Sequence, residues 1–148
     1  MTVGVFQSGS DLFGLPISSI KIVALFAALE PANTKADYCL GQLAGSDDQM
    51  KPVIDFARLL NSAPSPLVPL TAHLILCQLS QQEVYLAVDR FVDVSEVPLD
   101  QLTPPQPGHP WLGKVAGSFP CQWAPGQRAN LLVPNFLITP ERAPEREY

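Results

Sequence analysis

The chain has 148 residues, of which 47% are hydrophobic and 16% charged, with a formal net charge of −5. That length fits one domain, or two small subdomains around a shared core, and low charge with this apolar content argues against intrinsic disorder. The acidic balance argues against nucleic acid as a partner, because such binding begins with neutralised phosphates. The longest apolar stretch, residues 22–29, is far shorter than the roughly 18 residues of a membrane-spanning helix. We therefore expect no nucleic-acid binding and no membrane insertion.

The numbers of prolines and cysteines indicate the type of secondary structure and the state of the thiols. The 16 prolines are about twice the average usage, and each one removes a backbone donor and fixes φ. This pattern predicts short strands joined by turns rather than long helices. The cysteines, Cys39, Cys77 and Cys121, are odd in number and widely spaced, which favours reduced thiols and a cytoplasmic location over a disulfide framework.

The first half of the chain predicts strands, turns and one short helix. Apolar residues alternate from Val3 and again from Phe13, with turn-forming residues at 8–11 between the two runs. A polar turn at 45–49 leads into an extended segment at 51–54. Residues 55–61 are the best helix candidate, about two turns long with Asp55 as a possible N-cap.

The second half continues as strands after a Ser- and Pro-rich stretch at 61–70, which indicates a boundary between two halves. We expect strands at 73–79, 84–88, 91–97, 111–115 and 130–138. Residues 98–110 contain five prolines and predict a stiff connection instead. The tail at 139–148 is charged and is expected to be flexible.

An internal echo supports two related halves. The apolar pattern that starts at Phe13 repeats from Val84 at a constant offset of 71, with the same change from a two-residue to a three-residue step. A weaker echo pairs Val53, Asp55 and Phe56 with Val133, Asn135 and Phe136. The repeat favours two β-subdomains in one chain.

Candidate chemical sites are weak. Residues 108–115 have phosphate-loop spacing, but Val115 replaces the Ser or Thr that would hold Mg²⁺. His73 and Cys77 are four apart on a predicted strand, about 13 Å, which is too far for two ligands of one zinc. We expect no catalytic residue, metal or cofactor. A small-molecule-binding or hydrolytic barrel that uses His73, Cys77 or Asp89 stays open as an alternative.

Four ordered stretches resemble the CheW-like domain, the coupling module of chemotaxis arrays. They lie at residues 13–20 (FGLPISSI), at Gly41 with 51–60 (KPVIDFARLL), at 87–94 (AVDRFVDV) and at 130–138. Together they cover most of residues 3–138 in the family's order. The resemblance implies a mainly β fold of two SH3-like five-stranded barrels with a shared core and one or two short helices, forming a single domain over 1–138.

The resemblance also implies a function without catalysis. Family members bind the cytoplasmic tip of a chemoreceptor and the regulatory domain of a CheA-type histidine kinase. The implied partner-binding positions are Ile20, Ile22, Gly41, Leu43 and Asp47, and the implied structural positions are Pro52, Asp55 and Asp89. We therefore expect a signalling adaptor for chemotaxis or surface (twitching) motility.

Several contact positions depart from the family pattern. The family usually has an arginine shortly after the matched glycine, whereas this chain continues from Gly41 to Asp47 and Asp48 without one. Ile22 stands where a glutamate is common. These changes predict an altered receptor partner. The alternative is a structural β-domain that uses the same groove between the barrels for an unrelated protein.

Overall fold

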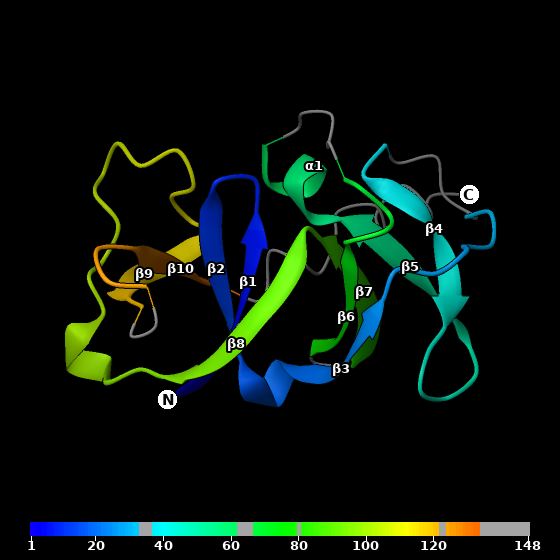
Figure 1. Ribbon diagram of the computed structural model, residues 1–148, viewed down its shortest axis with the longest axis horizontal. Helices are drawn as coiled ribbons and strands as arrows, with labels where there is room; N and C mark the ends of the chain where they lie inside the picture. The colour runs from blue at the N-terminus through cyan, green and yellow to red at the C-terminus, as the bar shows by residue number, and fades with distance from the viewer. Residues whose placement is uncertain (33–36, 62–66, 80, 122–123, 134–148) are drawn as a thin grey trace.

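The computed structural model describes residues 1–32, 37–61, 67–79, 81–121 and 124–133. These residues form two five-stranded sheets that lie side by side, with one short helix, α1 (Phe56–Asn61), above their junction (Figure 1). The first sheet has the order β8 (Arg90–Glu96), β1 (Thr2–Ser8), β2 (Asp11–Pro16), β10 (Arg128–Leu132), β9 (Val115–Pro120). The second has the order β3 (Ile20–Leu25), β6 (His73–Leu79), β7 (Gln82–Val88), β5 (Met50–Asp55), β4 (Cys39–Ala44). The 3₁₀ turns are η1 (Ile17–Ser19) and η2 (Leu99–Gln101).

The predicted fold class is confirmed: the chain is mainly β, with two five-stranded SH3-like sheets and one small helix. The strand expected at 111–115 is wrong. Trp111 O accepts hydrogen bonds from the backbone N–H groups of Lys114 and Val115, and Gly113 has φ +89°. This segment is therefore a turn, and β9 begins only at Val115. The strand expected at 130–138 begins earlier, at Arg128 of β10, and its predicted end lies outside the described residues, as does the tail at 139–148.

The strand order accounts for the offset of 71. In the first sheet, β1 and β2 form a hairpin, β2 runs parallel to β10, and β8 pairs with β1. In the second sheet, β6 and β7 form a hairpin, β7 runs parallel to β5, and β3 pairs with β6. The five strands β1–β5 therefore repeat as β6–β10. The pairing of β10 with β2 and of β5 with β7 places Leu131 at the position equivalent to Val53, which is an offset of 78 residues. The weaker echo in the sequence has an offset of 80, so its alignment differs from the structural one by two residues.

Each sheet combines strands from both repeats. The chain leaves the first sheet after β2, builds β3 to β7 in the second, and returns at β8. As a boundary between folded subdomains, the predicted division near residues 61–70 is therefore wrong, because β5 before it and β6 after it belong to the same sheet. The division instead separates two sequence repeats, β1–β5 and β6–β10, and each repeat contributes strands to both sheets.

The exchange creates three apolar clusters. The largest contains residues of both sheets and of α1, including Phe6, Phe13, Phe56 and Ile75, all at most 1% exposed. Two smaller clusters belong to one sheet each. One includes Val3 and Phe119 of the first sheet, and the other includes Val53 and Leu74 of the second. The largest cluster joins the two barrels, and this buried apolar area stabilises their mutual arrangement.

Each sheet closes on itself through the chain that follows its edge strand. After β3, Glu30 pairs with Gln42 of β4, and after β8, Thr103 pairs with Ser118 of β9. Both pairs are joined by two backbone hydrogen bonds. The bonds between Glu30 and Gln42 are 3.0 and 2.9 Å long, and those between Thr103 and Ser118 are 2.8 and 2.9 Å long. This closure covers the outer edges of β4 and β9 at those residues, whereas β3 and β8 stay at the ends of their strand orders.

Candidate functional site

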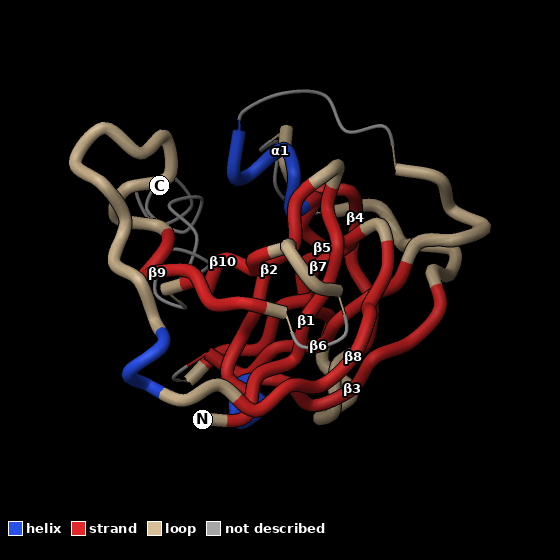
Figure 2. Tube along the Cα trace, turned by 60° about the vertical axis from the view of Figure 1, so that its left-hand side comes forward, coloured by secondary structure: helices blue, strands red, loops and turns tan. Residues whose placement is uncertain are grey.

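The candidate site is the surface formed by β3 and β8, the two edge strands. Both views place β3 beside β8 (Figures 1 and 2). Apolar side chains on these strands are exposed, with Ile22 at 52%, Leu25 at 73% and Val94 at 46%. We call the exposed apolar residues of β3, β8 and η1 the β3–β8 surface: Ile17, Ile22, Val23, Leu25 and Val94. Apolar residues gathered on open strand edges mark a protein-binding surface.

The two strands meet over a glycine of β1. A Cβ atom on Gly4 would come within 2.5 Å of Ile20 Cδ1 and 3.1 Å of Phe91 Cε1. Ile20 and Phe91 are related by the repeat and occupy equivalent positions on β3 and β8. Both pack partly buried against the largest core cluster. The absence of a side chain at Gly4 thus lets both strands approach the junction of the barrels.

A histidine connects the strands. His73 lies opposite Leu25 of β3 in the backbone ladder, and its Nδ1 accepts a hydrogen bond of 2.9 Å from the backbone N–H of Phe91 on β8. Sequence reasoning considered His73 only as a metal ligand or catalytic group. Its position at the start of β6, with all of β7 between it and the apolar Phe91, gives no local signal for this contact.

The structure separates the predicted partner-binding residues. Ile22 is exposed on β3, whereas Ile20 is half-buried against the core. Gly41 and Leu43 lie on β4, at the opposite end of the strand order. Gly41 is buried beneath Leu29 and the Glu30 carbonyl, and Leu43 packs against the cluster of the second sheet. These two β4 residues therefore help to close the barrel.

Asp47 lies in the turn between β4 and β5 and is exposed. Its Oδ1 accepts a hydrogen bond from Gln49 N, and its Oδ2 lies 3.1 Å from Lys51 Nζ. The Gln49 N–H, followed by the Lys51 ammonium, lowers the pKa of Asp47. The negative charge at this turn is accordingly partly offset by Lys51.

A polar cluster that sequence reasoning missed joins this turn to β3. Glu83, at the start of β7, is 6% exposed. Its carboxylate lies 2.6 Å from Lys21 Nζ, accepts a 3.1 Å bond from Ser46 N, and is also bonded to Ser46 Oγ. The Lys21 ammonium and then Ser46 lower the pKa of Glu83. The available signal was Lys21, a charged residue within an apolar run, whereas Glu83 lies just before the strand expected at 84–88 and gave no signal.

None of the three predicted structural positions belongs to the β3–β8 surface. Pro52 sits opposite Gln42, just before β5 begins to pair with β7, where a missing N–H is tolerated. Asp55 is 2% exposed, and its Oδ1 accepts a 3.4 Å bond from Arg58 N at the start of α1, as an N-cap does. Asp89 Oδ2 accepts a 2.7 Å bond from Gly9 N, where φ is +63°. Asp89 thereby supports the turn between β1 and β2.

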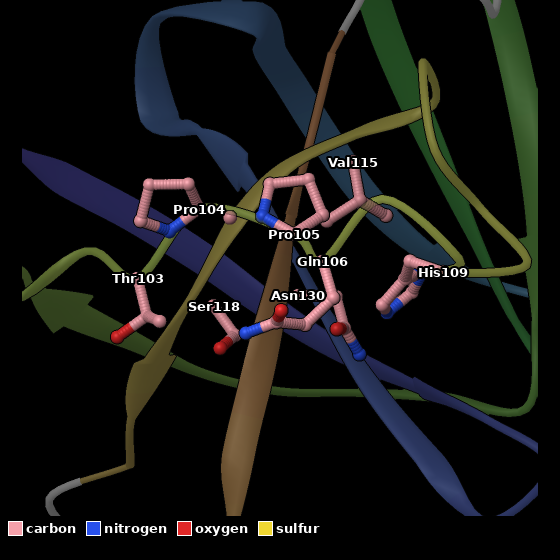
Figure 3. A pocket seen from close by; sticks show the side chains of 9 residues that line it. Thr103, Pro104, Pro105, Gln106, His109, Val115, Ser118 and Asn130 are labelled. Carbon is pink, nitrogen blue, oxygen red and sulfur yellow. The ribbon is translucent and has the colours of Figure 1, made fainter.

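One pocket among the described residues bears on the alternative of a small-molecule or hydrolytic barrel, and His73, Cys77 and Asp89 do not line it. A shallow pocket of about 150 Å³ lies beneath the proline-rich connection of the first sheet, lined among others by Pro105, Gln106, His109 and Asn130 (Figure 3). Ligand pockets usually have about 300–1,000 Å³. Burial raises the pKa of the Cys77 thiol to about 12, so Cys77 stays protonated at neutral pH.

In the described part of the chain, no three His, Cys, Asp or Glu residues come together in a group that could hold a metal ion. Within the same residues, no helix is long and apolar enough to cross a membrane.

Two strand-exchanged barrels, with apolar edge strands exposed at their junction, define a protein-binding scaffold. The chain matches the family model of the CheW-like domain over residues 2–135, and it belongs to that family. Its fold is similar to the crystal structure of the scaffolding protein TtCheW from Thermoanaerobacter tengcongensis, with a TM-score of 0.76 and 17% sequence identity. The similarity covers 89% of this chain and 83% of that chain. No curated protein matches the chain.

The resemblance inferred from the sequence is thus confirmed. CheW-like domains are non-enzymatic scaffolds of chemotaxis signalling, so the chain is a coupling adaptor of this class and not an enzyme.

Proposed function

We propose that this protein links a chemoreceptor to a CheA-type histidine kinase in the cytoplasm, in a chemotaxis or surface (twitching) motility system. The observation that carries the proposal is the β3–β8 surface, where Ile22 and Leu25 of β3 and Val94 of β8 are exposed beside the junction of the barrels. An amphipathic helix places its apolar face on such a surface. The receptor tip is the partner we assign to it.

The composition of this surface, together with that of the turn after β4, supports a partner that differs from the family's usual receptor. Apolar Ile22 replaces a common glutamate, and the turn after β4 carries Asp47 and Asp48 in place of an arginine. Burial of apolar area, rather than an arginine–carboxylate pair, then supplies the main attraction. Binding should accordingly depend weakly on salt concentration, because screening acts on charges and leaves apolar contacts in place.

Ile22 is the residue that tests this surface, rather than Ile20. Ile20 packs against the shared core, so Ile20→Asp would destabilise the fold and confuse loss of binding with unfolding. Ile22→Glu changes an exposed residue, and Leu112→Glu is a matched control because Leu112 is 54% exposed on the turn before β9. Both variants should unfold at nearly the temperature of the wild type.

The test is a reconstitution of three components: the adaptor, the kinase, and a soluble fragment of a receptor cytoplasmic tip from the same organism. We expect the wild type and Leu112→Glu to bring receptor and kinase together in co-sedimentation. We expect Ile22→Glu to lose the receptor fragment and to retain the kinase. If the wild type binds neither component, the adaptor function is wrong and a structural β-domain with an unrelated partner takes its place.

A further inference from the structure

We propose that His73 is a positioning residue of the β3–β8 surface, which it builds by holding β8 at a fixed distance from β3. This inference rests on the proposed receptor-binding function. Its basis is that His73 contacts both strands of the surface. Its backbone lies in register with Leu25 of β3, and its Nδ1 accepts the 2.9 Å bond from Phe91 N on β8.

The bond fixes β8 at a point where the strand is irregular. The ladder between β1 and β8 shifts register between Val5 and Phe6, so β8 has an extra residue next to Phe91. Bulges of this kind re-aim the side chains of the bulged strand. By anchoring the amide of Phe91, His73 sets the direction in which β8 leaves the junction and hence where Val94 lies relative to Ile22.

The repeat shows that the fold does not require this bond. At the equivalent place in the other repeat, Thr2 stands for His73 and Ile20 stands for Phe91. Thr2 directs its hydroxyl to the carboxylate of Glu96 instead of toward Ile20. One sheet thus forms its β1–β8 ladder around a threonine at this position. The histidine adds a connection between the two sheets that the repeated architecture lacks.

The chemistry of the bond limits which side chains can replace His73. An imidazole nitrogen accepts a hydrogen bond only when it carries no proton, so the neutral ring must hold its proton on Nε2. The Oδ1 atom of an asparagine can take the place of Nδ1 as acceptor. A leucine has similar volume and offers no acceptor. His73→Asn and His73→Leu therefore separate the hydrogen bond from side-chain packing.

The experiment combines ¹⁵N NMR of the protein with titrations of a soluble receptor-tip fragment and of the kinase regulatory domain. We expect the His73 ring of the wild type to show the Nε2–H form. We expect faster exchange of the Phe91 amide in His73→Leu than in wild type or His73→Asn. His73→Leu loses the hydrogen bond that positions β8, and the free energy of one such bond predicts about tenfold weaker receptor binding. His73→Asn should bind within about threefold of wild type, and kinase binding should not change.

Different results overturn different claims. Equal receptor affinity of His73→Leu and wild type, with faster exchange at Phe91, would show that the bond forms but does not position the surface. An Nδ1–H form of the wild-type ring would disprove the bond itself, and this result does not depend on whether His73→Leu folds. If the wild type fails to bind the receptor fragment at all, the proposed function fails and the positioning role falls with it.

Discussion

Gly41 and Gly117 perform the same task in the two barrels. A Cβ atom on Gly41 would lie 2.6 Å from the carbonyl oxygen of Glu30, and one on Gly117 would lie 2.7 Å from that of Thr103. In each case the next residue, Gln42 or Ser118, pairs with the segment that crosses above. The two glycines thus permit the backbone crossing that closes each barrel.

This relationship predicts that Gly41→Ala and Gly117→Ala each lower the free energy of unfolding. The added methyl group meets a backbone oxygen that cannot move without breaking the closure, and overpacking of this kind costs about 1–3 kcal/mol. Gly108→Ala is the control, because nothing lies within 4 Å of its Cβ position and its φ is not positive. Urea unfolding of the three variants measures the difference. A Gly117→Ala protein as stable as Gly108→Ala would contradict the shared role.

The lowered pKa of Glu83 predicts that the free energy of unfolding of the protein depends on pH. Its pKa is lowered in the folded protein by Lys21 and then by Ser46, so the folded state binds the proton less readily than the unfolded state. The stabilisation is complete above the ordinary glutamate value of 4.5 and is lost as the pH falls through the lowered folded pKa. At pH 7 we expect Glu83→Gln to unfold more easily by about 1–3 kcal/mol.

Denaturant unfolding between pH 3 and pH 7 tests this expectation, with the wild type and Glu83→Gln compared at each pH. The difference between them should shrink steadily toward the acidic end. Asp100→Asn, at an exposed carboxylate in η2, is the control. A difference between Glu83→Gln and wild type that stays constant over the whole range would show that the charge of Glu83 contributes nothing.

The repeat indicates which apolar residues can replace the ion pair of Lys21 and Glu83. At the offset of 71, Lys21 and Glu83 correspond to Val92 and Leu12, which pack in the apolar cluster of the first sheet. Glu83→Leu alone leaves the Lys21 ammonium without its carboxylate, and Lys21→Val alone leaves Glu83 buried without its cation. Glu83 is buried, whereas the Lys21 side chain is 39% exposed. Removing one partner of an ion pair is costly where it leaves a buried charge unpaired, whereas replacing both partners by apolar residues is often neutral or stabilising.

We therefore expect the double variant Lys21→Val/Glu83→Leu to be more stable than either single variant. A double-mutant cycle of unfolding free energies should give a coupling of about 0.5–3 kcal/mol. Additive effects of the two substitutions would show that Lys21 and Glu83 do not stabilise each other, which contradicts this expectation.

The N-cap of α1 gives a further prediction. Asp55 is buried and accepts a hydrogen bond from Arg58 N, so Asp55→Ala should lower the free energy of unfolding by about 0.5–2 kcal/mol, whereas Asp55→Asn keeps an acceptor at the cap. Thermal unfolding of both variants provides the measurement. Receptor and kinase affinities should stay as in the wild type, because α1 lies apart from the β3–β8 surface (Figure 1). Weaker receptor binding by a folded Asp55→Ala protein would assign Asp55 to the binding site.

Local sequence patterns predict the strands of this protein better than their pairing. Alternation around Val3 and Phe13 marks β1 and β2, and the offset of 71 relates β2 and β3 to β7 and β8. The exchange of strands between sheets depends on contacts such as that of Asn130 Nδ2 with Leu12 O, at opposite ends of the chain, for which no local pattern gives a signal. The same reason explains why Gly41 matched a family motif but its crossing partner, Glu30, could not be foreseen.

The site shows the same limit. The resemblance implies Ile22 as a partner-binding position, and Ile22 is exposed, as a binding residue must be. The roles of His73 and Glu83 depend on Phe91, Lys21 and Ser46, which are distant in sequence. Of these residues, Lys21 and His73 stand in or at the start of apolar runs, which indicates a partner, whereas Glu83 falls outside the expected strand at 84–88 and carries no such indication.

The central claim is that this CheW-like domain couples a receptor to a kinase, and a calorimetric titration tests it most directly. The purified protein is titrated with the regulatory domain of a CheA-type kinase from the same organism, with Ile22→Glu as a folded comparison. We predict binding of about micromolar affinity, about −8 kcal/mol, for both proteins, because our proposal assigns the β3–β8 surface to the receptor and not to the kinase. The absence of heat from a folded wild-type protein, at concentrations where a micromolar complex would form, would contradict the coupling function.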